Sequence, residues 1–419
     1  MNQKSRKQGV VWGLVVAALF GFYVGRNVVA ASAQIGRGPS DFAHSYWAAR
    51  ATLEGASPYS VRGFLYPPAA LLPVLPLATR DEATARRWWF SISQLLLLAA
   101  AIAVWRRLGG GAQPAAVVVV VWSLTGTVAE NLVLGQINPV LLILITAAMV
   151  APVIATSRSA AFIGAAGAVK IWPALLLAAP LLQRKWRAFA VGCAVAAALL
   201  IGGGMTLTAL RPPPYHPQGM GSWAGSPAFL NLSLPATALR LADPPDDWRE
   251  IPQSWLVGNR LEDVELPAPA ALLSLATALL TLGGGLFLIF RLVRPETPRL
   301  AIYAALIALA LAAAPVSWYH YRLLHLPGLA WLALALLTRR DHRGLALLAA
   351  LVAGVTWSHL AWLPPTGIAV APVFVVVRGL LVPVLELVLA AWYLRAAAHT
   401  PSGHREPTTQ NSKLRTQNC

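Results

Sequence analysis

Acidic residues are scarce in this chain. Aspartate and glutamate together account for 16 of its 419 residues, against 33 lysines and arginines, and all charged types make up only 12% of the sequence. Soluble globular domains contain about 25% charged residues, so this composition excludes a soluble protein. Because 57% of the residues are hydrophobic, the sequence predicts an integral membrane protein, in which each carboxylate of a polar segment is informative.

Cysteine is equally rare. Cys193 lies inside an apolar run and Cys419 ends a polar tail, which excludes a disulfide framework. The sequence also lacks a glycine-rich nucleotide-binding motif, a cluster of metal ligands and a serine nucleophile elbow. We therefore predict no cofactor and no metal site, while composition leaves a divalent-metal requirement open. A site without nucleotide chemistry needs a substrate that is already activated.

Long apolar runs recur along the chain, which favours an all-α polytopic membrane protein over a barrel of short alternating strands. The runs are residues 10–31, 88–105, 114–129, 139–155, 160–182, 189–210, 268–290, 300–315, 323–337, 345–362 and 368–394. Residues 65–78 are also apolar, but this segment is short and interrupted by prolines, so we interpret it as a dipping or surface element. The sequence therefore predicts ten full membrane spans, or twelve if residues 65–78 and 160–182 both cross.

Basic residues predict the orientation in the membrane. Lys4, Arg6 and Lys7 precede the first run, so the N-terminus is predicted to be cytoplasmic and the first loop external. In the first half of the chain, two arrangements satisfy the preference of basic residues for the cytoplasmic side equally well, depending on whether residues 65–78 cross the membrane. In the second half the arginine clusters all fall inside, which places the C-terminus in the cytoplasm. The net charge of +17 therefore reflects topology, and no nucleic-acid partner is predicted.

The predicted organisation is one membrane-embedded domain with polar ends. Residues 1–9 form a cytoplasmic tail, residues 10–395 the membrane domain, and residues 396–419 a disordered cytoplasmic tail. Two outer loops, residues 32–65 and 211–267, interrupt the domain. We predict a multi-pass protein of the plasma membrane.

The first outer loop contains a helical pattern over residues 40–55. Its apolar face comprises Phe42, Tyr46, Ala49 and Leu53. Such a helix is expected to lie on the membrane surface. Asp41 begins the pattern directly after Ser40. Two interpretations of Asp41 remain open: its carboxylate caps the helix, or partial burial tunes it into a general base.

Lys170 lies in the middle of an apolar run, just before Trp172 and Pro173. If residues 65–78 do not cross, residues 160–182 are expected to return to their starting side as two half-helices. A charge at that depth is costly unless it is paired or faces a cavity. Either the ammonium extends to the membrane interface or it serves a function. A lone ammonium at a helix break suits a lipid phosphate.

His320 and Arg322 follow Trp318 at the junction between two apolar runs. The aromatic residues there are typical of an interfacial belt, whereas the two cationic side chains suit a phosphate leaving group. Two other polar segments have simpler interpretations. The joint at residues 130–138 is typical of a turn between two spans, and residues 228–241 are typical of an amphipathic loop helix.

Taken in order, these motifs resemble glycosyltransferase family 87, whose members take a sugar from a polyprenyl-phosphate donor. The matching residues are Asp41, Tyr46-Trp47-Ala48-Ala49, Glu54-Gly55, Pro58-Tyr59, Tyr66-Pro67-Pro68, Gly135-Gln136-Ile137-Asn138, Lys170 with Pro173, Asn231 with Ser233, and Ser317-Trp318 with His320. Their order, and their places between the predicted spans, make the resemblance specific. One departure is Tyr321, which stands where the family often has a second histidine.

The resemblance implies a C-type membrane glycosyltransferase fold of about 10–12 transmembrane helices, with its active site on the extracytoplasmic face. It implies an inverting transfer in which Asp41 is the catalytic base. The implied donor-phosphate ligands are Lys170, His320 and Arg322. The implied substrate-binding residues are His44, Tyr59, Tyr66, Gln136, Asn138, Asn231, Ser233 and Trp318. The partners would be a polyprenyl-phosphate sugar, with mannose preferred and arabinofuranose the other candidate, a cell-envelope glycan or glycolipid acceptor, and the lipid bilayer.

A lipid or sugar transporter, or a flippase, is the main alternative, because intramembrane charge and broken helices are also features of transporters. Against it stand the lack of an internal repeat and the concentration of polar residues in the outer loops. The third interpretation is a non-catalytic subunit of a cell-envelope complex. Such a subunit would keep the fold and tolerate replacement of Asp41.

Overall fold

The computed structural model of the chain describes residues 3–35, 40–61, 63–152, 156–209, 231–242, 267–294, 297–314, 316–356 and 372–399. Within these ranges the protein is helical, with one isolated β-bridge and no strand. Most of the predicted outer loop 211–267 and residues 400–419 of the predicted C-terminal tail lie outside the described residues.

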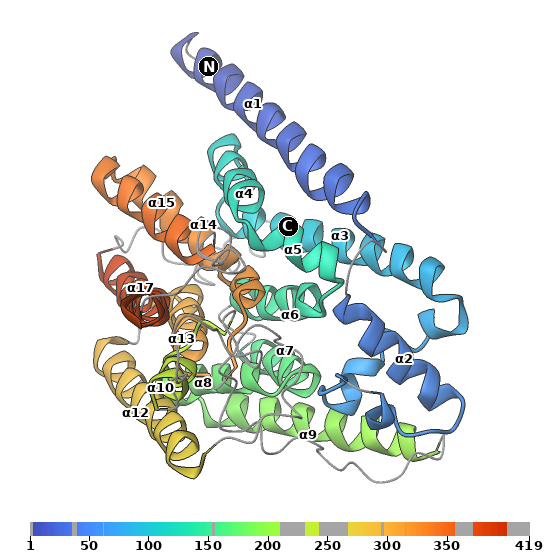
Figure 1. Ribbon diagram of the computed structural model, residues 1–419. Helices are drawn as coiled ribbons and strands as arrows, with labels where there is room; N and C mark the ends of the chain where they lie inside the picture. Colours follow the sequence, from blue (N-terminus) through green and yellow to red (C-terminus); the bar gives the residue numbers. More distant parts are fainter. Residues whose placement is uncertain are drawn as a thin grey trace, which may run out of the picture.

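The helices follow one another in two groups (Figure 1). The first group is α1 (Gln3–Tyr23), α2 (Asp41–Leu53), α3 (Glu82–Arg107), α4 (Ala112–Leu124), α5 (Thr127–Leu134), α6 (Asn138–Val150), α7 (Thr156–Val169), α8 (Ala178–Leu182) and α9 (Trp186–Ala209). The second is α10 (Leu234–Ala242), α12 (Ala268–Leu292), α13 (Arg299–Ala313), α14 (Leu326–Thr338), α15 (His342–Thr356) and α17 (Pro372–Ala398). A π-helical segment, η1 (Val24–Ala30), continues α1.

Six of the described helical segments are long and apolar enough to cross a membrane. They are Val10–Ala30, Glu82–Arg107, Trp186–Met205, Ala268–Leu292, Tyr319–Thr338 and Gly379–Ala398. The bent pair α4 and α5, which meet at 57°, makes a seventh if counted as one span. Shorter apolar helices overlap other predicted runs: Asn138–Val150, Trp172–Leu182, Arg299–Ala313 and His342–Gly354. Residues 153–155 and 357–362 of these runs lie outside the described residues. The all-α polytopic fold is confirmed, and the number of ten to twelve spans stays a prediction.

Helices break at the places indicated by lysine and proline. α7 ends at Val169, and the 3₁₀-helix η6 (Trp172–Leu177) begins after a two-residue bend at Lys170. Pro173 has no N–H to donate to an α-helical hydrogen bond. The break into two helical segments is confirmed, and the return of residues 160–182 to their starting side stays a prediction. Residues 65–78 form only short 3₁₀ turns, η3 (Pro68–Leu71) and η4 (Leu77–Thr79).

α13 forms the centre of the second group. All of its residues are buried, and it contacts α6, α12, α14 and α17. A helix that is apolar on every side belongs in an interior, and its many alanines let neighbouring helices approach closely. A Cβ atom on Gly328 of α14 would lie only 2.7 Å from the Cβ of Ala304. α13 thereby fixes α14 and the 3₁₀-helix η8 (Tyr319–His325) that precedes it.

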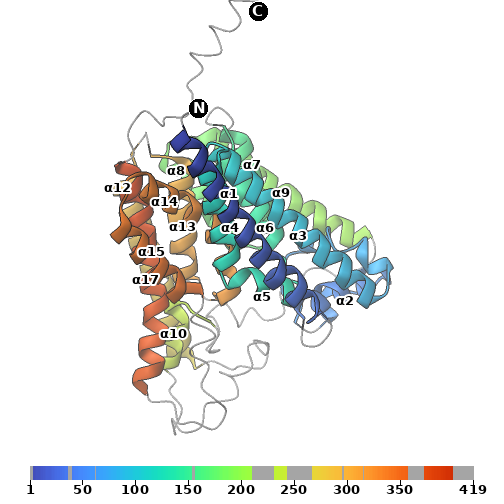
Figure 2. The ribbon, with the colours of Figure 1, turned by 90° about the horizontal axis from the view of Figure 1, so that it is seen from above.

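Different helices lie at the two ends of the molecule. The start of α1 lies at one end, whereas α2, α5 and α10 lie toward the other (Figure 2). η8 contacts α5 and α6, which brings the second half of the chain to the start of α2. The candidate site is built at this second end.

Candidate functional site

The first turn of α2 positions Asp41. Ser40 has an extended backbone, and its hydroxyl bonds the Leu134 carbonyl oxygen at 3.2 Å instead of capping the helix. Asp41 is thus the first helical residue, and its carboxylate accepts a hydrogen bond from the amide of Gln136. The predicted helix over residues 40–55 is confirmed, and Phe42, Tyr46 and Ala49 of its apolar face are buried. Leu53 is 42% exposed.

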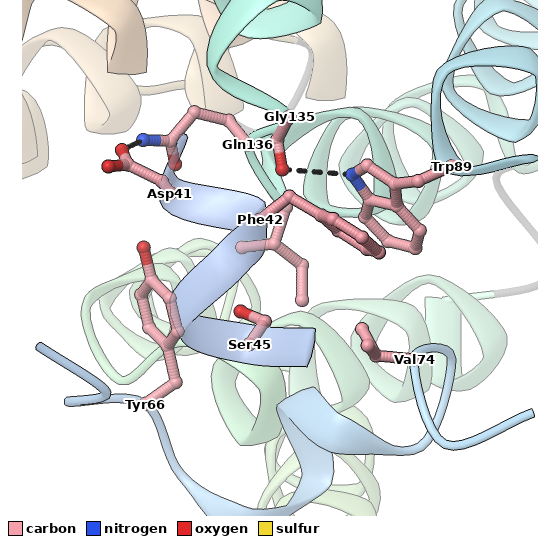
Figure 3. Close-up of a pocket in the computed structure, with 9 residues that line it drawn as sticks. Asp41, Phe42, Ser45, Tyr66, Val74, Trp89, Gly135 and Gln136 are labelled. Atoms are coloured by element: carbon pink, nitrogen blue, oxygen red, sulfur yellow. Dashed lines mark hydrogen bonds between the residues drawn. The ribbon is translucent and has the colours of Figure 1, made fainter. Parts of the chain in front are cut away.

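A narrow pocket surrounds Asp41 (Figure 3). It is lined by Asp41, Phe42, Ser45, Tyr66, Val74, Trp89, Gly135, Gln136 and Ile137. Phe42 stacks on Trp89 with ring centroids 5.6 Å apart, and the Trp89 indole donates to the Gly135 carbonyl oxygen at 2.9 Å. The Tyr66 hydroxyl points toward the Asp41 carboxylate (Figure 3). The contacts of Phe42 and Trp89 hold the α5–α6 joint against α2, and Gln136 in this joint is thereby fixed beside Asp41.

The environment of Asp41 changes its acidity. Burial raises the pKa of the Asp41 carboxyl above its usual range, because the charged form loses hydration. The charges of His44 and Lys170 act in the opposite direction but do not cancel this effect. An aspartate with a raised pKa is a stronger base than an exposed one, as proton abstraction near neutral pH requires.

Gly135 allows the close approach between this joint and α2. It ends α5 in the left-handed region, with φ of 65°, and a Cβ atom there would lie 2.6 Å from the Cβ of Phe42. We expect Gly135→Ala to destabilise the protein by about 1–3 kcal/mol, because left-handed strain and steric overlap add. Gly110→Ala is the control, since Gly110 has φ of 71° but open space around it.

Thermal unfolding of the purified variants measures this difference. A larger loss for Gly135→Ala than for Gly110→Ala shows the packing contribution beyond backbone strain. Equal losses would contradict a close contact between Gly135 and Phe42.

Lys170 lies where α7 ends, and its side chain is buried. Among the described residues its ammonium has no hydrogen-bond acceptor. It lies 3.7 Å from the ring centroid of Tyr321 and 5.1 Å from that of Tyr66. Aromatic faces stabilise a cation but leave its three N–H groups without acceptors, so the site is suited to an anion. Tyr66 connects the two groups, because its ring lies beside the Lys170 ammonium and its hydroxyl points toward the Asp41 carboxylate (Figure 3).

Tyr321 was not among the predicted site residues. Its ring packs against Trp172 at 6.4 Å and against His320 at 4.8 Å, and it supplies the nearer aromatic face to Lys170. The sequence marked this position only as a departure from the family pattern. In this chain the tyrosine contributes a ring to the cation site.

In the polar joint at residues 130–138, the turn interpreted from the sequence comprises residues 135–137, between the end of α5 and the start of α6. The joint also connects the site to η8. Asn138 donates to Asn131 at 2.8 Å, and Asn131 donates to the His320 carbonyl oxygen at 2.8 Å. Glu130 was missed as a site residue. It accepts a hydrogen bond from the Tyr319 hydroxyl, and its charge interacts with that of Asp41. A second carboxylate thus lies near the first.

The segment that leads into η8 is held in place by three predicted site residues, Asn231, Ser233 and Trp318. Asn231 and Trp318 form the isolated β-bridge, and the Asn231 side-chain oxygen accepts from the Ser317 N–H at 2.8 Å. The Ser233 hydroxyl accepts from the N–H of Ala236 at 3.3 Å, at the start of α10. α10 confirms the helix predicted within residues 228–241. These contacts connect α10 to η8 and favour a positioning role for the three residues.

Tyr59 and His44 do not line the pocket around Asp41. The Tyr59 hydroxyl donates to the Tyr66 carbonyl oxygen at 3.1 Å, so Tyr59 supports the loop that carries Tyr66. The imidazole of His44 lies beside Gly63, where a Cβ atom would be 2.7 Å away. His320 is buried between the rings of Tyr319 and Tyr321.

Arg322 is held in an internal ion pair, which disfavours the phosphate contact implied by the resemblance. Its guanidinium lies 2.9 Å from the Glu386 carboxylate and donates to the Leu232 carbonyl oxygen at 3.2 Å. The same carboxylate lies 2.6 Å from His325. Glu386 was missed, although an acidic residue inside the apolar run 368–394 is itself a signal of a buried partner.

The fold and site define a polytopic helical membrane protein in which one tyrosine, Tyr66, borders both a buried carboxylate and a buried ammonium. The sequence profile of glycosyltransferase family 87 matches residues 64–317, which is more than half of the chain. The chain therefore belongs to glycosyltransferase family 87 and is a membrane glycosyltransferase. The match includes Tyr66, Gln136 and Lys170 and begins after Asp41. No curated protein matches the chain.

Proposed function

We propose that this glycosyltransferase moves a sugar, preferentially mannose, from a polyprenyl-phosphate donor to a cell-envelope glycan or glycolipid. The transfer takes place on the extracytoplasmic face of the plasma membrane and inverts the anomeric configuration. The observation that supports it most is the arrangement of Asp41 and Lys170: a base held by Gln136, beside a buried ammonium that lacks a hydrogen-bond acceptor among the described residues.

The proposed reaction begins when the Asp41 carboxylate takes the proton of an acceptor hydroxyl. The acceptor oxygen attacks the anomeric carbon on the face opposite the phosphate, and the bond from that carbon to the phosphate oxygen breaks. Lys170 donates hydrogen bonds to the departing polyprenyl phosphate and stabilises its developing charge. Gln136 keeps the carboxylate oriented, and Tyr66 and Tyr321 hold the ammonium in place.

His320 is the second proposed contact of the phosphate, because η8 brings its ring against Tyr321 at the cation site. Arg322 acts differently. By holding the carbonyl oxygens of Leu232 and Trp318, it fixes the backbone on either side of the β-bridge, so we assign it a positioning role.

Lys170→Met tests the phosphate contact. We expect kcat/KM for the lipid-linked donor to fall by about 10- to 100-fold, because a hydrogen bond to a charged group contributes about 1.5–3 kcal/mol. Initial rates measured over a range of donor concentrations give this value. Lys185→Met is the matched control, since Lys185 lies in the turn between α8 and α9. Donor kinetics that are the same in the two variants would remove Lys170 from this role.

The raised pKa of Asp41 predicts a pH dependence. A general base works only when deprotonated, so kcat should decline as pH falls through a value above the ordinary aspartate pKa of 3.8. A pH–rate profile of the purified enzyme measures this decline of kcat at low pH. Activity that stays constant down to pH 4 would contradict a buried carboxylate as the base.

The identity of the sugar needs a panel of donors. Purified protein in detergent, without vesicles, is given polyprenyl-phosphate mannose, arabinofuranose and glucose, each with and without a chelator. We expect transfer from the mannose donor to be fastest, and the chelator arm decides whether a divalent metal takes part. Transfer from none of these donors would refute the proposed donor class.

A further inference from the structure

A second cavity lies at the far end of α14, between α15 and α17. Its volume is about 660 Å³, within the range of small-molecule sites. α14 begins at η8 and ends at the turn that contains Arg339, which donates to the Ala396 carbonyl oxygen at 3.0 Å. A 13-residue helix is about 20 Å long, so this cavity is separate from the Asp41 pocket.

One side of the cavity is basic. Arg343 and Arg395 line it with exposed side chains, and among the described residues neither has a hydrogen-bond or ion-pair partner. The acidic lining residue is Asp341, whose carboxylate accepts from the Gly344 N–H at 2.8 Å and so serves the start of α15. The two guanidinium groups are therefore available to an anion.

Further along the same two helices the lining is apolar, since Leu347 follows Arg343 in α15 and Val388 precedes Arg395 in α17. Leu347 is 59% exposed and Val388 is 48% exposed, and Trp392 lies beside them in the lining. A small hydrophilic anion would leave these apolar side chains uncovered, whereas an uncharged lipid would leave the arginines unpaired. The cavity matches a ligand with a phosphate at one end and a hydrocarbon chain at the other.

We infer that this cavity binds an anionic phospholipid of the surrounding membrane. Arg343 and Arg395 hold the headgroup phosphate through charge-assisted hydrogen bonds, and the acyl chain lies along Leu347 and Val388. The site is independent of the proposed glycosyl transfer. The chain's own C-terminal residues suit it poorly, because residues 400–419 include Arg405, Lys413 and Arg415 against a single glutamate.

Native mass spectrometry of the full chain tests this site. The protein in uncharged detergent is titrated with phosphatidylglycerol or with phosphatidylcholine of the same acyl chains, and bound lipids are counted. We expect tighter binding of phosphatidylglycerol. In Arg343→Gln/Arg395→Gln this preference should fall by about 25-fold, as each arginine near a membrane surface contributes about fivefold.

Two further variants make the test specific. Arg291→Gln/Arg294→Gln removes the same charge from the exposed end of α12 and should leave lipid binding unchanged. Leu347→Glu places a carboxylate in the exposed apolar wall and should abolish the preference without disturbing the core. Equal losses in the α12 and cavity variants, or no preference in the unaltered chain, would overturn the inference. Binding that appears only after removal of residues 400–419 would assign the cavity to the tail instead.

Discussion

Asp41→Asn is expected to lower kcat for sugar transfer by about 10²- to 10⁴-fold, the usual cost of losing a general base. Asparagine keeps the size of the side chain and can still bond Gln136, but it cannot accept a proton at neutral pH. The donor phosphate contact to Lys170 is untouched, so KM for the donor should change little. Steady-state kinetics with the lipid-linked donor measure both values.

Glu54→Gln is the matched control for Asp41→Asn. Glu54 directly follows α2, and its exposed carboxylate pairs with Arg50 at 2.6 Å. The same chemical change there should leave kcat unaltered. An Asp41→Asn enzyme with the turnover of the Glu54→Gln control would exclude Asp41 as the base and would favour a structural role at the start of α2.

Glu386→Gln has the largest expected effect on stability, a loss of about 3–5 kcal/mol. Arg322 and Glu386 are fully buried and 2.9 Å apart, so removal of the carboxylate leaves an uncompensated charge in the protein interior. Thermal unfolding of the detergent-purified protein measures the change. The exposed pair of Arg50 and Glu54 provides the comparison, because solvent screens a pair of this kind and it contributes little to stability.

The double variant Arg322→Met/Glu386→Met separates the ion pair from the other contacts of Arg322. Replacing a buried pair by apolar residues is often neutral, so part of the lost stability should return. The recovery should be incomplete, because the carbonyl oxygens of Leu232 and Trp318 lose their donor. A Glu386→Gln protein as stable as the Glu54→Gln control would show that the buried pair contributes nothing.

Local chemistry was sufficient to predict much of the fold. The period of the apolar residues in α2 and the apolar runs are properties of neighbouring residues, and both predicted helices, whereas the number of spans stays a prediction. The break at Lys170 followed from Pro173 and from the cost of a charge in an apolar run. By contrast, the bend between α4 and α5 has no proline to mark it.

Contacts between distant segments were not predictable from residue patterns. Asn131 and His320 are 189 positions apart, and Asp41 and Gln136 are 95 apart, so no periodicity connects them. The family resemblance grouped Asp41, Gln136 and Lys170; in the structure Gln136 contacts Asp41, and Lys170 lies beside Tyr66 of the same pocket. It also grouped Arg322 with the phosphate ligands, where the missed partner Glu386 changes the interpretation. Predicting this pair required knowledge of how α17 packs against η8.

The most direct measurement compares two forms of the same activated sugar. Purified protein in detergent, with a membrane glycolipid fraction as acceptor, is given radiolabelled mannose either on polyprenyl phosphate or on a nucleoside diphosphate. We predict that the label enters the glycolipid from the lipid-linked donor alone, and that Asp41→Asn abolishes this transfer while Glu54→Gln does not. Transfer from the nucleotide donor alone, or transfer that Asp41→Asn leaves intact, would contradict a reaction at Asp41 and Lys170.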